Sequence, residues 1–60
     1  MQIGSLFINI KEINYFEVFE ITSVDIRIYI YFKNGSSVWT RTNGEEIEKL
    51  KQKFNSIIIS

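Results

Sequence analysis

The chain has 60 residues, with seven Lys and Arg balanced by seven Asp and Glu, and it contains neither Cys nor His. Without Cys or His the chain has no disulfide, no ordinary zinc site, no thiolate and no imidazole base, so we expect no enzyme, no metal and no cofactor. The zero net charge gives no long-range attraction to nucleic acid, and no apolar run reaches the roughly 18 residues of a membrane span. We therefore expect a cytoplasmic protein with no membrane partner.

The small size of the chain predicts marginal stability and self-association. A chain of 60 residues forms one domain, residues 1–60, and buries only about 60% of its unfolded surface, so its stability is marginal. Apolar residues make up 45% of the sequence, which predicts a folded rather than a disordered chain. Oligomerisation is the common remaining way to stabilise so small a domain, and we expect a homo-oligomer.

The first third of the chain predicts two strands. Leu6, Ile8 and Ile10 alternate with Phe7 and Asn9, so residues 5–10 predict a first strand, closed by a tight turn. Residues 13–21 are rich in β-branched and aromatic side chains and predict a second strand. We expect Phe16 and Val18 to face the core, because this orientation leaves Glu17 in solvent.

The strongest signal is a β-hairpin over residues 24–42, where alternating apolar and polar side chains run into Asn34-Gly35 and continue beyond it. The two sides of its first arm differ in character. One side is aliphatic and aromatic, and the other mixes rings with cations. The core side carries Ile26, Ile28, Ile30 and Phe32, and the opposite side carries Arg27, Tyr29, Tyr31 and Lys33.

The register of this hairpin has two possible forms. A two-residue turn places Trp39 and Arg41 on the core side, which leaves a cation pointing inward. A three-residue loop over residues 34–36 places Trp39 and Arg41 on the opposite side, beside Tyr31 and Tyr29. We favour the three-residue loop, because it leaves no charged residue facing the core.

The last third of the chain predicts a helix. Asn43 is a suitable N-cap, and Glu46 follows three residues later as in a capping box. An apolar stripe then recurs with helical spacing and predicts the side that packs on the sheet; it consists of Ile47, Leu50, Phe54 and Ile57. Residues 57–59 allow three interpretations: a last helical turn, a fifth strand or a subunit contact.

These elements predict an α+β fold, a four-stranded antiparallel meander sheet with one C-terminal helix packed on one face. One helix cannot cover both faces of such a sheet, and exposed Tyr, Trp and Arg side chains are typical of interaction sites. The exposed face is our candidate partner-binding surface. It carries Tyr15, Glu17, Phe19, Arg27, Tyr29, Tyr31, Lys33, Trp39 and Arg41.

Three partners fit this surface: a second copy of the chain, a different protein, or nucleobases. Aromatic side chains between arginines and lysines can stack the bases of single-stranded nucleic acid or of a small nucleotide. The zero net charge argues against a nucleic-acid polymer. We therefore predict a non-enzymatic protein-interaction module that self-associates through this face, and base stacking is the alternative.

The segments INYFEVFE, IRIYIYFKNG and EEIEKLKQKF resemble small, mostly uncharacterised β-β-β-β-α proteins of AT-rich Gram-positive bacteria and their phages. The resemblance covers most of the chain and implies an accessory or host-interaction protein, such as an inhibitor of a bacterial defence system. A looser likeness to LytTR-type DNA-binding domains rests on Ile13, Tyr15, Glu17, Gly35, Leu50 and Phe54. Those domains are longer and end in a basic, histidine-containing stretch that this chain lacks, so DNA binding is not carried over.

Overall fold

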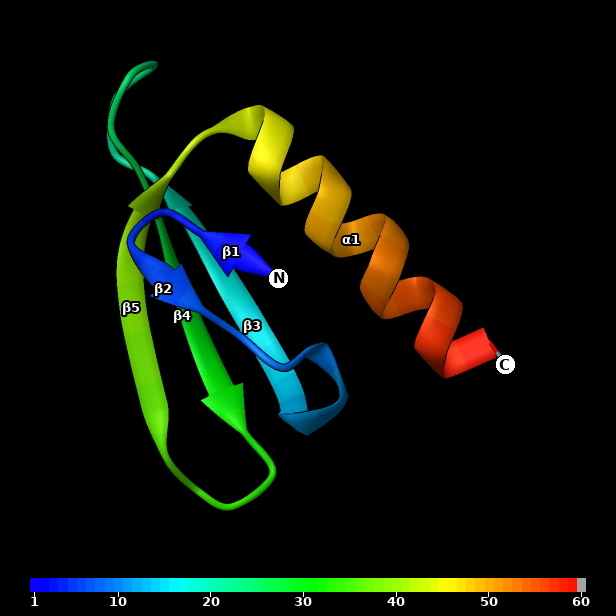
Figure 1. The fold of residues 1–60 in the computed structure, drawn as a ribbon. Coiled ribbons are helices and arrows are strands. Elements are labelled where there is room, and N and C mark those ends of the chain that lie inside the picture. Colours follow the sequence, from blue (N-terminus) through cyan, green and yellow to red (C-terminus); the bar gives the residue numbers. More distant parts are fainter. Residues whose placement is uncertain (60) are drawn as a thin grey trace.

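A computed structural model describes the backbone of residues 1–59 and the side chains of residues 1–55. Two antiparallel sheets and one long helix make up the fold (Figure 1). A two-stranded sheet pairs β1 with β2, and a three-stranded sheet has the order β3-β4-β5. The elements are β1 (Gln2–Ile3), β2 (Leu6–Phe7), the 3₁₀ turn η1 (Ile10–Glu12), β3 (Ile13–Glu20), β4 (Ile26–Phe32), β5 (Ser37–Thr42) and α1 (Gly44–Ile59).

The predicted α+β class with a C-terminal helix is confirmed, but the four-stranded meander is wrong. Residues 5–10 do not form a strand of the main sheet, because the chain turns back at Gly4, whose φ is 55°. Ile3 therefore pairs with Leu6 in a short N-terminal hairpin. Beyond it, the Asn9 side chain accepts a hydrogen bond from the Lys11 N–H and caps η1. Local capping thus ends the alternation before a full strand can form.

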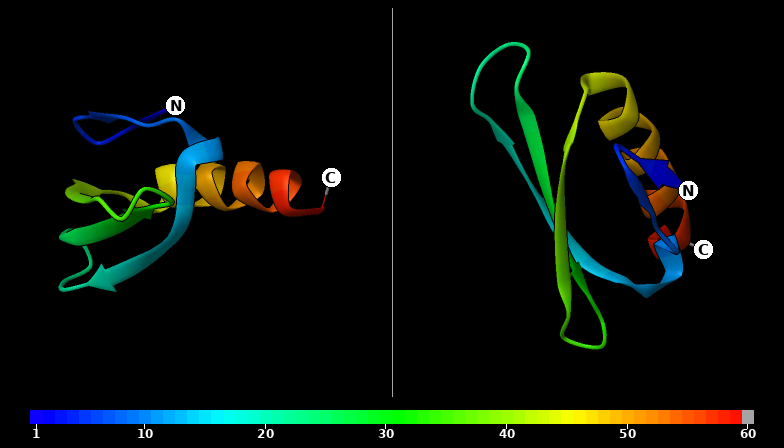
Figure 2. Two further views of the ribbon diagram at one scale, coloured as in Figure 1. Left: turned by 90° about the horizontal axis from the view of Figure 1, so that it is seen from below. Right: turned by 60° about the vertical axis from the view of Figure 1, so that its left-hand side comes forward.

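The helix and the N-terminal hairpin lie on the same side of the three-stranded sheet (Figure 2). Together they bury the inner face of β4 and β5, where Ile28, Ile30 and Thr40 lie. The sheet thus has one covered face and one open face, which we call the outer face. The buried core cluster comprises Ile3, Ile8, Ile13, Ile28, Ile30 and Leu50, with Phe16, Val38 and Phe54 among the partly buried side chains packed on it.

The hairpin between β4 and β5 has a three-residue loop, as preferred, but the loop lies one residue earlier than predicted. The Phe32 N–H donates to the Ser36 carbonyl at 2.8 Å, so residues 33–35 form the loop, with Gly35 at φ 91°. Trp39 faces outward as predicted, yet it lies opposite Tyr29 rather than Tyr31. The Asn34 side chain decides this position, because it accepts hydrogen bonds from the Ser36 N–H and hydroxyl and so fixes the turn locally.

Helix α1 begins as predicted at the Asn43 cap, whose side chain accepts a hydrogen bond from the Glu46 N–H at 2.9 Å. Glu46 does not complete a capping box. Its two carboxylate oxygens each accept from the Gly4 N–H at 3.1 Å, and one of them also accepts from the Thr42 hydroxyl at 2.9 Å. The carboxylate therefore joins the N-terminal hairpin to the start of the helix.

The predicted apolar stripe of α1 faces the core. Ile47 and Leu50 are buried, and Phe54 is half-buried and meets Phe16 edge to face at 5.5 Å. Of the three interpretations of residues 57–59, the backbone adopts the helical one. The predicted inward orientation of Ile57 lies outside the described side chains.

Candidate interaction surface

Three rows of side chains cross the outer face from β3 through β4 to β5. Each row consists of residues that the strand pairing places opposite one another. Their order follows from the strand pairing and not from the sequence. The rows are Tyr15-Tyr31-Ser37, Glu17-Tyr29-Trp39 and Phe19-Arg27-Arg41. Directly opposed side chains on one face lie about 4.5 to 5.5 Å apart at Cβ, so each row is a chain of contacts.

The aromatic rings of the outer face contact one another rather than standing alone. Tyr15 stacks on Tyr31 with ring centroids 4.4 Å apart, and Tyr29 lies nearly parallel to Trp39 at 6.1 Å. Phe19 meets Tyr29 edge to face at 5.4 Å. Such pairs stabilise their own arrangement by about 0.5 to 1.5 kcal/mol. The rings thus form a pre-arranged apolar platform.

Charged side chains border this platform and largely neutralise one another. The Arg27 guanidinium lies 5.6 Å from the Trp39 ring centroid, in cation–π geometry. Asp25 contacts both arginines, with an oxygen 3.5 Å from Arg27 Nη2 and the other 3.8 Å from Arg41 Nε. Asp25 and Arg27 are half-buried and Arg41 is exposed, and their ion pairs hold the arginine head groups at one end of the face.

Glu17 is the acid of the middle row and lies on the edge strand β3. Acting as a hydrogen-bond acceptor, its carboxylate raises the pKa of the neighbouring Tyr31 hydroxyl above the ordinary value of 10.0, and burial of the hydroxyl adds to the effect. The Tyr31 side chain is therefore neutral across the physiological range. Glu17 gives the platform one fixed polar group, which suits orientation of a partner rather than catalysis.

The structure brings together all but one of the predicted site residues. A depression of about 390 Å³ is lined by Glu17, Phe19, Ile21, Arg27, Tyr29 and Tyr31. The predicted residue that does not join them is Lys33, which follows the end of β4 in the loop. Asp25 and Ile21 belong to the face and were missed, although both continue the period-two alternation of β3 and β4 toward the turn that joins these strands.

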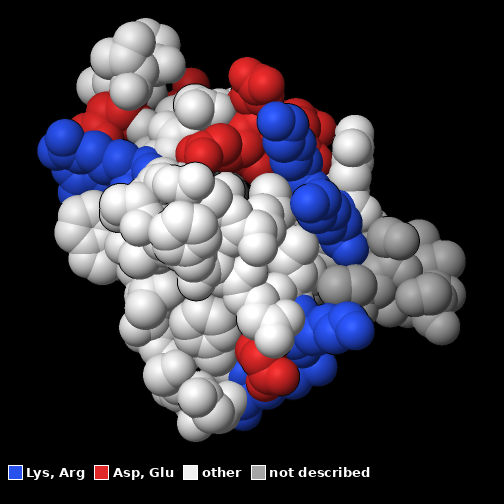
Figure 3. All heavy atoms as spheres, viewed as in Figure 1, with Lys and Arg blue, Asp and Glu red and all other residues white. Residues whose placement is uncertain are grey.

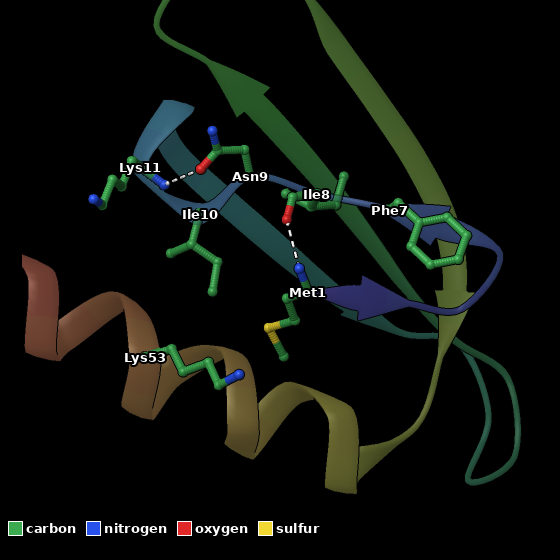
Figure 4. A pocket seen from close by; sticks show the side chains of 7 residues that line it. All are labelled: Met1, Phe7, Ile8, Asn9, Ile10, Lys11 and Lys53. Carbon is green, nitrogen blue, oxygen red and sulfur yellow. Dashed lines mark hydrogen bonds between the residues drawn. The ribbon is translucent and has the colours of Figure 1, made fainter.

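Two further hollows lie outside the depression of the outer face. The first, of about 580 Å³, is lined by Met1, Phe7, Ile8, Asn9, Ile10, Lys11 and Lys53 (Figure 4). Its two lysines do not converge: Lys53 extends toward Met1, whereas Lys11 points away (Figure 4). The second, of about 600 Å³, lies at the β5 border beside Trp39 and Arg41. Neither brings together groups that would bind a charged ligand.

The helix side of the molecule carries no field of a single sign. Acidic and basic side chains lie beside one another around an uncharged middle (Figure 3). On α1, for example, Lys49 pairs with Glu45 at 3.6 Å and Lys51 with Glu48 at 3.9 Å. This face therefore offers no continuous cationic track for a phosphate backbone.

Comparison with known proteins gives no relative from which to infer function: no family model, no curated protein and no solved structure matches the chain. The resemblance to small phage and bacterial proteins stays a prediction.

Among residues 1–59, no group of three or more acidic, Cys or His side chains is placed to hold a metal ion. Within the same range, no helix has the length and apolarity needed to cross a membrane.

Proposed function

We propose that this protein is a non-enzymatic interaction module and that the outer face of its three-stranded sheet contacts another protein surface. One observation carries the proposal: the aromatic rows are uncovered although they are ordered. Trp39 is 53% exposed, Tyr15 48% and Phe19 46%, while their rings stack on neighbours. Contiguous exposed Tyr, Trp and Arg side chains are typical of protein interfaces and of their energetic hot spots.

A second copy of the chain is the partner that the charges favour. The outer face carries the acids Glu17 and Asp25 and the bases Arg27 and Arg41, with Glu17 on the β3 side and Arg41 on the β5 side. A two-fold axis parallel to the strands lays β3 of one copy over β5 of the other. That arrangement places Glu17 over Trp39 of the second copy, one row from its Arg41, and lays Tyr29 and Tyr31 over their own copies. Arg27 also lies over Arg27 of the second copy, and each of the two is paired with its own Asp25.

The size of the face predicts that this contact is weak. Three strands about 4.8 Å apart and six residues long cover roughly 300 Å² in projection. Stable interfaces bury about 800 Å² per partner, and smaller ones are transient. We therefore expect association that depends on concentration, with dissociation on dilution.

Base stacking fits the same rings less well. Tyr29 already lies on one side of Trp39, the Arg27 guanidinium approaches the same ring, and Tyr15 and Tyr31 stack on each other. Single-stranded nucleic-acid proteins instead present ring faces to successive bases along a basic groove. A protein partner can contact the edges of the rings and the platform as a whole, so its binding requires no rearrangement of the stacked rings.

The test is the double variant Tyr29→Ala with Trp39→Ala, which removes the pair at the centre of the platform. Because cross-strand pairs contribute only about 0.2 to 1 kcal/mol each, we expect the far-ultraviolet circular dichroism spectrum to be unchanged. Size-exclusion chromatography with light scattering over a dilution series should show a lower association state for the variant than for the parent at each concentration.

Phe7→Ala is the matched control, because Phe7 is 84% exposed but lies on β2, away from the outer face. It should associate like the parent. A strictly monomeric parent at high micromolar concentration, or equal loss of association in both variants, would contradict the proposal. Quenching of Trp39 fluorescence by oligo-dT or oligo-rU that weakens as salt rises would favour base stacking instead.

A further inference from the structure

The two edges of the three-stranded sheet differ in how far the rest of the chain covers them. The edge at β5 is partly covered by the turn of the N-terminal hairpin. There the Ser5 N–H lies 3.5 Å from the Thr40 hydroxyl oxygen, and Gly4 packs so closely on the Arg41 carbonyl that no side chain fits. Among the residues that the structure describes, none covers the edge at β3 in this way, and Figure 2 (left) shows β3 as the outermost strand of the sheet.

The strand pairing fixes which backbone groups of β3 point to the open edge. Phe32 directs its N–H to Ser36 on the β5 side, and Lys33 directs its N–H to Glu12 on the β3 side. Because direction alternates along a strand, the odd-numbered residues of β4 bond to β3. On β3 their partners are Tyr15, Glu17 and Phe19. The N–H and C=O groups of Phe16, Val18 and Glu20 therefore face outward.

β3 has some of the features that usually protect an edge strand and lacks others. It carries Glu17 and Glu20, but it is eight residues long, contains no Lys, and belongs to a chain without Pro. Its bulge lies at the start, between Ile13 and Tyr15, and leaves the rest of the strand regular. In addition, Val18 points to the inner side yet is 38% exposed, so the helix leaves this part of the strand uncovered.

We propose that the open edge of β3 pairs with β3 of a second copy, antiparallel, with Val18 opposite Val18 of that copy. This register places Phe16 opposite Glu20 and Glu17 opposite Phe19, and it covers the exposed Val18 side chains. Centring the pair on Glu17 instead would oppose two carboxylates, which is destabilising. Centring it on Phe16 would extend the pairing into the bulge at Asn14.

Edge pairing would give one continuous sheet of six strands. Its two-fold axis is perpendicular to the sheet, so both outer faces point the same way and form one platform of twice the area. This inference deepens the proposed function by naming how copies first meet, and its own evidence is the open edge rather than the aromatic rows. A doubled platform also comes closer to the size of a stable interface than the single face does.

The test uses single cysteines in this cysteine-free chain. In the proposed register the Cα atoms of residue 18 lie about 5.5 Å apart across the axis, within the range of a disulfide. Val18→Cys should therefore give a covalent dimer under mild oxidation. Glu20→Cys is the matched control on the same edge: its two copies lie about 13 Å apart along the strand and should not cross-link.

A second pair of variants tests the backbone bonds. Val18→Pro removes an N–H that faces the open edge, so the variant should stay folded and associate less than the parent. Phe19→Pro removes an N–H that bonds to β4 and should unfold the sheet. Equal cross-linking of the two cysteine variants, no cross-linking of either, or a folded Val18→Pro that associates like the parent would overturn the proposal.

The two proposals fail separately. Specific cross-linking at residue 18 with no effect of the Tyr29 and Trp39 double variant on higher association would keep the edge pairing and reject the outer face. Loss of association in that double variant without cross-linking at residue 18 would do the reverse.

Discussion

Replacing Gly4 by Ala should destabilise the protein more than any other glycine substitution. Gly4 has φ 55°, in the left-handed region that costs other residues about 1 to 2 kcal/mol. A Cβ at this position would also overlap the Arg41 carbonyl oxygen and lie 2.5 Å from the Thr40 hydroxyl oxygen. Overpacking of this kind costs about 1 to 3 kcal/mol. We therefore expect a loss of roughly 2 to 5 kcal/mol, a large part of the stability of so small a domain.

Urea denaturation followed by Trp39 fluorescence and circular dichroism measures this loss as a change in midpoint at constant slope. Gly35→Ala is the control, because Gly35 also has a positive φ, 91°, but no atom lies within 4 Å of its Cβ position. It should lose only the conformational cost, about 1 to 2 kcal/mol. Equal losses for the two variants would refute the reasoning, because they would show that the hairpin does not pack closely on β5.

Two further predictions concern the core and the outer face. Ile28→Ala and Leu50→Ala each remove a fully buried side chain and should cost roughly 2 to 5 kcal/mol; thermal melts within a few degrees of the parent would contradict the packing of helix on sheet. In a spectrophotometric titration, Tyr31 should ionise with a pKa above 10.0, and Glu17→Gln should lower that pKa. Because folding raises the pKa of Tyr31, the interaction stabilises the protein below the unfolded-state pKa of about 10, and this stabilisation is lost as pH rises through the folded-state pKa. An unchanged Tyr31 pKa in Glu17→Gln would show that the carboxylate does not cause the shift.

Local sequence patterns determined much of the fold. The alternation in residues 13–20 and 26–32 separates Phe16, Val18 and Ile28 from Tyr15 and Tyr29 on opposite faces, as observed, because the period of a strand is fixed at two. The cap at Asn43 depends only on groups within four residues. Features that need only neighbouring residues could therefore be predicted.

The first strand shows where such patterns stop being sufficient. Apolar side chains alternate in residues 5–10 whether the segment joins the main sheet or folds back on β1. The choice depends on Gly4, which turns the chain and lies against Arg41, and on Glu46, which accepts the Gly4 N–H from the helix. These contacts join positions about 40 residues apart, and no periodicity in the sequence indicates them.

For the candidate surface too, the sequence predicted some features and only the tertiary structure decided the others. Sequence alternation assigned Tyr29 and Tyr31 to one face, and the preference for a three-residue loop, which keeps Arg41 out of the core, added Trp39. The partner of Trp39 depends on where the loop turns, and Asn34 moves that turn by one residue. A shift of the loop by one residue moves every cross-strand partner by two, so side chains keep their face and change their neighbours. Only the tertiary structure decided which rings stack, and which edge of the sheet stays open, because both depend on where the N-terminal hairpin and the helix come to lie.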